Sequence, residues 1–206
     1  MKTYFFVLCM LFCSSAMQAQ ILNPPVVALD KMNVLYYGID NPITIGSPVD
    51  FSQVKISISN GTITGEGIHR IVRPESTEKN TVITIDVNGK KTSHEFRVKR
   101  IPDPVFKIGS GKKRMAVAEF KTQSFCRAEL ENFDFDLRFN IVSATVYFSE
   151  KGFDQVVQAT LSGNDLSPLS AQISRCQPGS QITFTDIAVQ GPDGIRMINE
   201  QSYLLY

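Results

Sequence analysis

The sequence predicts an all-β protein made of two small tandem β-sandwich domains, the second of which carries one short helix. Apolar and polar residues alternate in many short runs, as they do in strands that bury one face. Asn-Gly pairs follow two of those runs, and a proline-rich stretch divides the chain near its middle. A chain of 206 residues is long enough for two such domains, of roughly 80 and 100 residues.

The composition excludes several classes of protein. The chain carries 21 Lys and Arg residues against 20 Asp and Glu, a formal charge of +1, so it lacks the basic excess of a nucleic-acid binder. Apolar residues make up 43% of the chain, which is typical of a globular protein rather than a disordered one. Only two histidines are present, so little material exists for metal binding or acid–base catalysis.

The first 19 residues have the layout of a secretory signal peptide. Lys2 precedes an apolar stretch from Tyr4 to Phe12, and the exit follows at Ser14-Ser15-Ala16 or at Gln18-Ala19. This stretch is too short for a membrane helix, which needs about 17–25 residues, and no second candidate span follows. We expect cleavage after Ala19, with cleavage after Ala16 as the alternative, and therefore an exported chain without a membrane span.

Export changes the charge balance and the cysteine count. Removing Lys2 leaves 20 cations, equal to the 20 anions, and removing Cys9 and Cys13 leaves only Cys126 and Cys176. Paired cysteines persist in an oxidising compartment, so a Cys126–Cys176 disulfide is one expectation. Two separately buried free thiols are the other, because free cysteine behaves as a small apolar residue.

The first β domain is expected over residues 20–100. Residues 54–59 alternate apolar and polar side chains before the first Asn-Gly pair, which places the apolar ones on one face of a strand. Residues 81–87 lead into Asn88-Gly89, and residues 90–99 return after it. Asn-Gly accepts the positive φ angles of a type I′ turn, so this second pair predicts a β-hairpin.

Residues 101–104 are expected to form a short, stiff linker between the domains. Pro102 and Pro104 fix their own φ angles and bias the residues before them toward extended conformations. Helix is therefore excluded over this stretch.

The second β domain is expected over residues 105–206. In Phe133–Ile141 every odd position is large and apolar and every even position is polar, which predicts a long strand at the centre of the domain core. Gly191–Gly194 has the composition of a turn that closes a last hairpin. Further strands are predicted at residues 146–148, 155–161, 182–189 and 202–206.

One short helix is predicted within the second domain. Ser167 can cap its start and Pro168 suits its first position, while Leu169, Ile173 and Cys176 fall on one helical stripe. Gln177-Pro178-Gly179, directly after Cys176, ends the helix because proline and glycine break helices.

The sequence contains no convincing catalytic, cofactor or metal site. Asp134 and Asp136 would share one strand face, but this is the solvated face of an alternating strand. His69 and His94 lie in separate strands without Cys or acidic residues at metal-ligand spacing. The best catalytic alternative, Cys126 acting with one of the histidines, has no supporting local motif. We therefore expect no enzyme and no cofactor.

A basic loop is the best candidate for contact with a partner. Lys112, Lys113 and Arg114 follow Ser110-Gly111 and would lie in an exposed loop near the linker. A simply solvated loop is one interpretation, and a contact surface for an acidic partner is the other. Nucleic acid is not the expected partner of an exported, formally neutral chain.

Five motifs occur in a fixed order along the chain, at residues 32–36, 40–43, 97–104, 130–139 and 191–194. Together they resemble the C-terminal periplasmic region of the GldM/PorM gliding-motility and type IX secretion proteins of Bacteroidetes. The resemblance covers nearly the whole chain after the signal peptide, and it implies an envelope location and a pair of β domains that contact other secretion-machine proteins.

The chain also departs from that family's pattern. Members carry an N-terminal transmembrane helix and further periplasmic domains, whereas here a signal peptide leads directly into the last two domains. The resemblance therefore implies the fold, a tendency to form homodimers and a capacity to dock on an envelope protein, but neither membrane anchoring nor any catalytic residue.

Two functional hypotheses follow. The first is a non-enzymatic exported envelope protein of the periplasm that acts by protein–protein docking, similar to the periplasmic part of a type IX secretion or gliding motor component. The alternative is a secreted or cell-surface binding module, an adhesin or a binder of glycans or host proteins. The absence of Trp weakens glycan binding, because sugar sites usually use flat aromatic faces.

Overall fold

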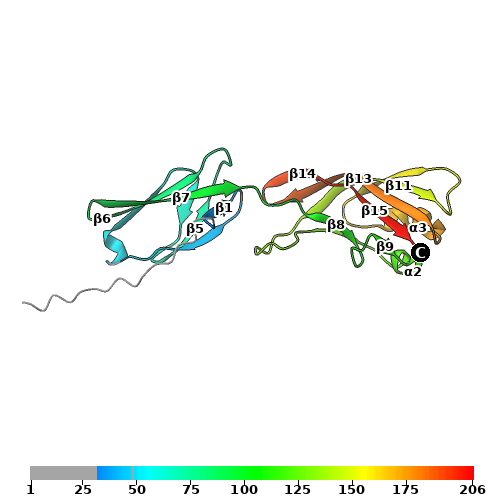
Figure 1. The fold of residues 1–206 in the computed structure, drawn as a ribbon, viewed down its shortest axis with the longest axis horizontal. Helices are drawn as coiled ribbons and strands as arrows, with labels where there is room; N and C mark the ends of the chain where they lie inside the picture. Colours follow the sequence, from blue (N-terminus) through cyan, green and yellow to red (C-terminus); the bar gives the residue numbers. More distant parts are fainter. Residues whose placement is uncertain (1–31, 48) are drawn as a thin grey trace, which may run out of the picture.

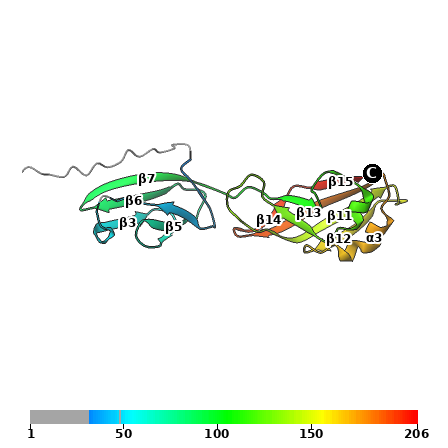
Figure 2. The same ribbon diagram turned by 90° about the horizontal axis from the view of Figure 1, so that it is seen from below.

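The structure is a computed structural model that describes residues 32–47 and 49–206. Strands hold 51% of these described residues and helices 10%, which confirms the predicted all-β fold class. The predicted signal peptide lies outside the described residues. The elements gather in two units at opposite ends of an elongated molecule, an N-terminal unit of residues 32–99 and a C-terminal unit of residues 105–206 (Figures 1 and 2).

The N-terminal unit is a sandwich of a four-stranded and a three-stranded sheet, with a short 3₁₀ turn η1 (Phe51–Gln53). All pairs of strands are antiparallel except β1 and β7, which run parallel. The first sheet has the order β1 (Val34–Tyr36), β7 (Lys90–Lys99), β6 (Thr81–Val87), β3 (Val54–Ile58), and the second the order β2 (Asn41–Thr44), β5 (His69–Arg73), β4 (Thr62–Thr64).

The predicted hairpin at Asn88-Gly89 is confirmed. Strands β6 and β7 pair up to Val87 and Lys90, and the two turn residues have φ angles of 53° and 86°, as a type I′ turn requires. The first Asn-Gly pair has a different role, because it carries the chain from β3 in one sheet to β4 in the other. There the buried Asn60 amide donates to the carbonyl oxygens of Ser76 and Lys79.

The C-terminal unit packs a two-stranded sheet against a larger one. The small sheet contains β8 (Val105–Ile108) and β10 (Cys126–Glu129). The large sheet has the order β12 (Val157–Ser162), β11 (Asn140–Glu150), β13 (Ser180–Gly191), β15 (Gln201–Leu205), β9 (Arg114–Met115), with β14 (Gly194–Ile198) also paired to β13.

Aromatic side chains join these two sheets. The Phe106 and Phe184 rings lie 4.6 Å apart between centroids, and the Ile108 backbone N–H donates to the buried Tyr203 hydroxyl at 2.9 Å. Tyr203 thus buries its ring and still satisfies its polar end. This core is far larger than that of the N-terminal unit, where Leu35, Val72 and Ile83 are the buried residues of the described cluster.

The predicted helix is present as a 3₁₀ turn η2 (Ser167–Leu169) followed by α3 (Ser170–Arg175). Leu169 and Ile173 are buried, as the helical stripe predicted. A second short helix, α2 (Val117–Lys121), buries Phe120 and was not predicted. Its five residues are too few to show a recognisable helical period.

The prediction that Phe133–Ile141 is the central strand is wrong. The regular strand β11 begins only at Asn140, and it is β11 that lies between β12 and β13. Residues 133–138 are irregular, yet Phe133 and Phe135 are half-buried while Asp134 and Asp136 are exposed. An extended segment lying against a core alternates its exposure just as a strand does, so the pattern predicted burial correctly and the hydrogen-bonded ladder incorrectly.

Candidate functional site: the junction and the surfaces beside it

The two units are joined by aromatic packing. Tyr36, the last residue of β1, places its ring 4.8 Å from Phe133 and 5.6 Å from Phe135 between centroids, at interplanar angles of 77° and 75°. Edge-to-face pairs of this kind contribute about 0.5–1.5 kcal/mol each beyond the area they bury. The segment expected to form the centre of one domain therefore holds two units together.

Arg196 on β14 fastens the linker to the C-terminal unit. Its Nη1 donates to the Ile101 carbonyl oxygen at 2.8 Å and to Asp103 Oδ1 at 3.0 Å, and its Nη2 contacts both carboxylate oxygens of Asp193. Its guanidinium also lies 5.1 Å from the centroid of the Phe139 ring. Because the Arg196 side chain is 18% exposed, these charge-assisted bonds are weakly screened by water.

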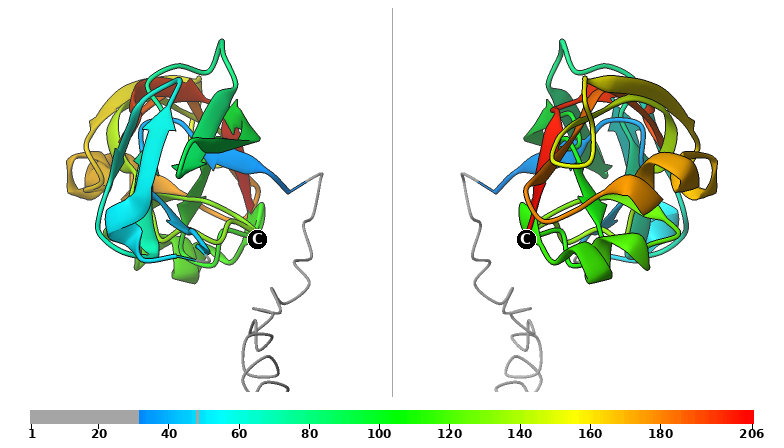
Figure 3. Two further views of the ribbon diagram at one scale, coloured as in Figure 1. Left: turned by 90° about the vertical axis from the view of Figure 1, so that its left-hand side faces the viewer. Right: turned by 90° about the vertical axis from the view of Figure 1, so that its right-hand side faces the viewer.

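The loop after β1 also contacts the C-terminal unit. Ile39 and Ile101 are both buried in the core cluster of that unit. Gly38 has a φ of +78°, and a Cβ built on it would lie 3.1 Å from the Cβ of Asp193. The position therefore requires glycine both for its backbone angle and for close approach. In Figure 3, which looks along the long axis, the two units lie one behind the other.

A pocket of about 380 Å³ opens at this junction. Its lining comes from both units and includes Arg73 and Glu75 from one and Pro192 and Asp193 from the other. Arg73 Nη2 donates to the Gly38 carbonyl oxygen at 3.0 Å, so its guanidinium is partly used in holding the loop. The pocket combines polar side chains with a contact between units but gathers no group of residues with a recognisable chemistry.

The predicted contact loop lies at the edge of the large sheet. Lys112 and Lys113 are exposed, and the Lys113 carbonyl oxygen accepts a hydrogen bond from the Leu204 N–H at 2.8 Å. Arg114, in β9, lies over the Tyr206 ring at 5.8 Å. Among the described residues, none of these three cations has an acidic partner within 4.0 Å. The loop is thus fixed by its backbone while its charges face solvent.

Lys107 differs from those cations although it is close to them in sequence. Its Nζ lies 2.8 Å from Glu131 and 3.5 Å from Glu129, and the hydrogen bond to Glu131 raises the pKa of the lysine. Among the described residues, Lys107 on β8 is therefore paired with acidic side chains, whereas the cations of the 112–114 loop are not.

Cys126 and Cys176 are both free and buried. The Cys126 Sγ donates to the Asn164 carbonyl oxygen at 3.3 Å, and the Cys176 Sγ to the Gln172 carbonyl oxygen at 3.6 Å. Burial raises the pKa of Cys126 to about 12 and that of Cys176 to about 11. Since the thiolate is the reactive form, neither cysteine is poised as a nucleophile.

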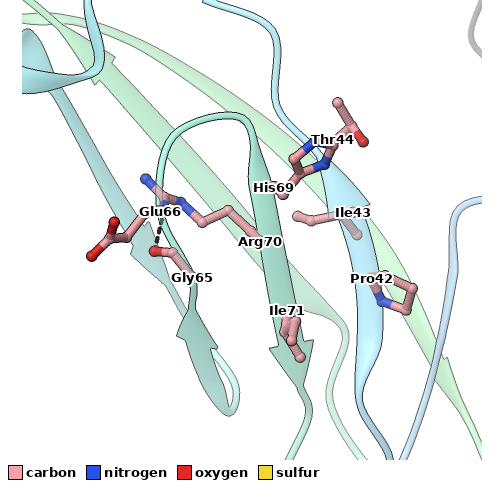
Figure 4. Close-up of a pocket in the computed structure, with 8 residues that line it drawn as sticks. All are labelled: Pro42, Ile43, Thr44, Gly65, Glu66, His69, Arg70 and Ile71. Atoms are coloured by element: carbon pink, nitrogen blue, oxygen red, sulfur yellow. Dashed lines mark hydrogen bonds between the residues drawn. The ribbon is translucent and has the colours of Figure 1, made fainter.

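The structure does not assemble the catalytic alternative. His69 in β5 and His94 in β7 are exposed residues of the N-terminal unit, whereas Cys126 is buried in the core of the other unit. His69 lines a pocket of about 360 Å³ together with Glu66, but in Figure 4 the Glu66 carboxylate points away from the His69 ring. Within residues 32–47 and 49–206, no three His, Cys, Asp or Glu side chains gather in a way that could hold a metal ion.

Two family profiles match the chain. Residues 82–200 match the GldM C-terminal domain, and residues 25–99 match the GldM third domain. The chain belongs to the GldM family. This confirms the resemblance found in the sequence motifs. No curated protein matches in a sequence search.

GldM-family domains point to a component of the gliding and type IX secretion apparatus, and the C-terminal domains of GldM proteins are periplasmic in the family. Membership therefore suggests partners within that machine. Of the helices that the structure describes, none has the length and apolar character needed to cross a bilayer.

Sequence reasoning missed the residues that form the junction. Tyr36 lies inside one of the five motifs, but nothing in its local pattern distinguishes a contact between units from a core residue. Arg196 is more than ninety residues away from Ile101 and Asp103 in the sequence, and no local pattern predicts contacts over that separation.

Proposed function

We propose that this GldM-family chain is a non-enzymatic exported envelope protein that acts by docking to other proteins of the gliding and type IX secretion apparatus. Its two β units would act as one rigid rod, because the contacts of Tyr36 and Arg196 fix the connection between them. The C-terminal unit of this rod would carry the docking surface. The single observation that carries the proposal is the match of residues 25–99 to the GldM third domain and of residues 82–200 to the GldM C-terminal domain.

The junction supports the idea of a rod. A freely jointed pair of domains would bury few residues between its parts, whereas here Ile39, Ile101 and Tyr36 pack into the C-terminal core. A braced connection transmits force or position from one end of a molecule to the other, which suits a part of a multi-protein machine.

The Lys112–Arg114 loop is the proposed docking surface, and its partner surface is acidic. Three adjacent cations without acidic neighbours keep their charge available, and their backbone anchor on β15 limits the ordering that a partner must impose. Exposed charges of this kind chiefly raise the association rate and make binding dependent on salt.

A capture experiment from detergent-treated cell envelopes tests this function. The full chain should retain gliding or secretion proteins, and the charge reversals Lys112→Glu and Lys113→Glu should release them. The matched control reverses two exposed lysines of the other unit, Lys55→Glu and Lys79→Glu, and should leave capture unchanged. Equal capture by both double variants would exclude the loop, and capture of no machine protein by the full chain would contradict the proposed function.

A further inference from the structure

Four rows of outward-pointing residues cross the large sheet of the C-terminal unit, and over β11 to β15 none of the residues in these rows is charged. The strands bury alternate residues in the core, so the residues between these point away from it. In Figure 2, β11, β12, β13 and β14 lie side by side. We call this surface the neutral face and order its rows by the β11 residue that each contains, which are Ser143, Thr145, Tyr147 and Ser149.

Hydroxyl and amide groups make up the centre of the neutral face. In the second row, Thr145 lies between Thr160 of β12 and Thr185 of β13. Two exposed acids lie beside this row but outside the paired registers, Asp186 where β13 passes from β15 to β14, and Glu200 in the bend between those two strands. The third row contains, in order, Gln158, Tyr147, Thr183 and Ser202.

The outer face of the four-stranded sheet in the N-terminal unit is different. Lys55, Asp86 and Lys91 align in one row across β3, β6 and β7, and Glu95 of β7 lies opposite Val82. Two sheets of the same chain thus differ in the charge of their outer faces, and the overall composition does not explain the neutral one. Neutral polar groups cost less to remove from water than charges do, so the neutral face is suited to burial under a partner.

The neutral face is continuous with the proposed docking loop. Its fourth row runs from Gln181 over Leu204 to Arg114, the last cation of that loop. Leu204 is 41% exposed, and Tyr206, whose ring lies under the Arg114 guanidinium, is 60% exposed. An uncharged centre with charged residues at its border is the usual anatomy of a protein–protein interface.

We propose that the neutral face and the Lys112–Arg114 loop form one docking surface, whose occupant is a protein of the gliding and type IX secretion apparatus with an uncharged centre and an acidic border. This inference rests on the proposed function and names the chemistry of its partner. A carboxylate placed over Thr145 would lose its water without gaining a cation, whereas one placed over Lys113 gains a cation. The partner's acids are therefore confined to the side that meets the loop.

The size of the neutral face favours such a partner over a second copy of the chain. Four rows about 6.7 Å apart on four strands about 4.8 Å apart cover on the order of 500 Å². Each protein in a specific interface buries about 800 Å², and each half of an obligate dimer buries more than about 1,000 Å². The neutral face alone is thus too small for a stable dimer, and it approaches the size of a specific docking surface only together with the loop.

A single charge at the centre of the neutral face tests the proposal. Thr145→Arg in the full chain should reduce the capture of machine proteins from detergent-treated envelopes about tenfold or more, because the new cation is buried without a partner. This loss should persist from about 0.05 M to about 0.5 M salt, whereas the loss caused by Lys113→Glu should shrink. Thr84→Arg is the matched control, because Thr84 is also half-buried and lies between Ser57 and Ser93 in an outward row of the other unit. It should capture like the unchanged chain.

A second measurement leaves Thr145 in place. A photoreactive residue at Thr160, its neighbour in the second row, should form an adduct with a gliding or type IX secretion protein, and the same residue at Thr84 should not. Circular dichroism establishes that Thr145→Arg is folded before its capture is compared.

The outcomes separate this inference from the proposed function. If the loop reversals release machine proteins but folded Thr145→Arg retains them, the neutral face is not part of the docking surface and the proposed function stands. If the unchanged chain captures no machine protein, both are wrong. Thr160 adducts between two copies of this chain, with a doubled mass that Thr145→Arg reduces to that of one chain, would overturn the inference in favour of a dimer. Thr160 adducts only with proteins outside the machine would overturn it as well.

Discussion

Arg196 holds the carboxylate of Asp193 through both oxygens, at 2.8 and 2.9 Å, and with its other terminal nitrogen it reaches the linker. The two terminal nitrogens of the planar guanidinium thus donate to the turn 191–194 and to the linker at the same time, which the single nitrogen of a lysine cannot do in this geometry. The Asp193 side chain is only 7% exposed, so it depends on this partner for compensation of its charge.

Arg196→Ala should destabilise the C-terminal unit and free the linker. The change leaves the Asp193 carboxylate buried without its cation, and we expect a loss of about 2–3 kcal/mol in the free energy of unfolding. Denaturant unfolding measures it. Arg127→Ala is the matched control, because its ion pair with Glu129 is exposed and should contribute less than about 1 kcal/mol. Equal losses in the two variants would contradict the role given to Arg196.

Tyr36→Ala should loosen the contact between the units. It removes both edge-to-face contacts, with Phe133 and with Phe135, and small-angle scattering should show a broader distribution of end-to-end distances. Tyr36→Phe keeps both rings in place and should scatter like the unchanged chain. If the alanine variant also scatters like the unchanged chain, the aromatic contact does not brace the junction.

Elements that depend on nearby residues could be predicted from the sequence, whereas contacts between distant residues could not. The 81–99 hairpin and the helix near Leu169 depend on turn and capping residues that act within a few positions, and both were found. The alternation at residues 133–138 indicates burial, and its apolar side chains do pack against the core of their own unit and against Tyr36, but without the hydrogen-bonded ladder that makes a strand. The contacts of Arg196 with Ile101 and Asp103 could not be predicted, because only the complete fold brings these residues together.

Cys126 and Cys176, the two cysteines that remain when residues 1–19 are removed, should titrate as free thiols. Cys126 and Cys176 are buried with raised pKa values, so they should react with a thiol reagent at pH 8 only slowly until denaturant is added, and two thiols should then appear. A count of zero in the denatured, unreduced chain would show the disulfide instead.

Stability should fall at alkaline pH. Burial raises the pKa of Cys126 from 9.0 to about 12 and that of Tyr203 from 10.0 to about 12, so above pH 9 the unfolded chain releases protons that the folded chain still holds. The stabilisation is complete below pH 9 and is lost as the pH rises toward 12. Melting temperatures recorded from pH 7 to 11 should decline above pH 9, and Cys126→Ala should flatten that decline; an equally steep decline in the variant would contradict the assignment.

Site-specific photo-cross-linking in living cells tests the docking account most directly. A photoreactive residue at Lys113 should form an adduct with a gliding or type IX secretion protein, and the same residue at Lys55, which is exposed on the other unit, should not. Adducts of equal yield from both positions, or adducts from Lys113 only with proteins outside that machine, would contradict the claim that this loop is the docking surface of a GldM-family component.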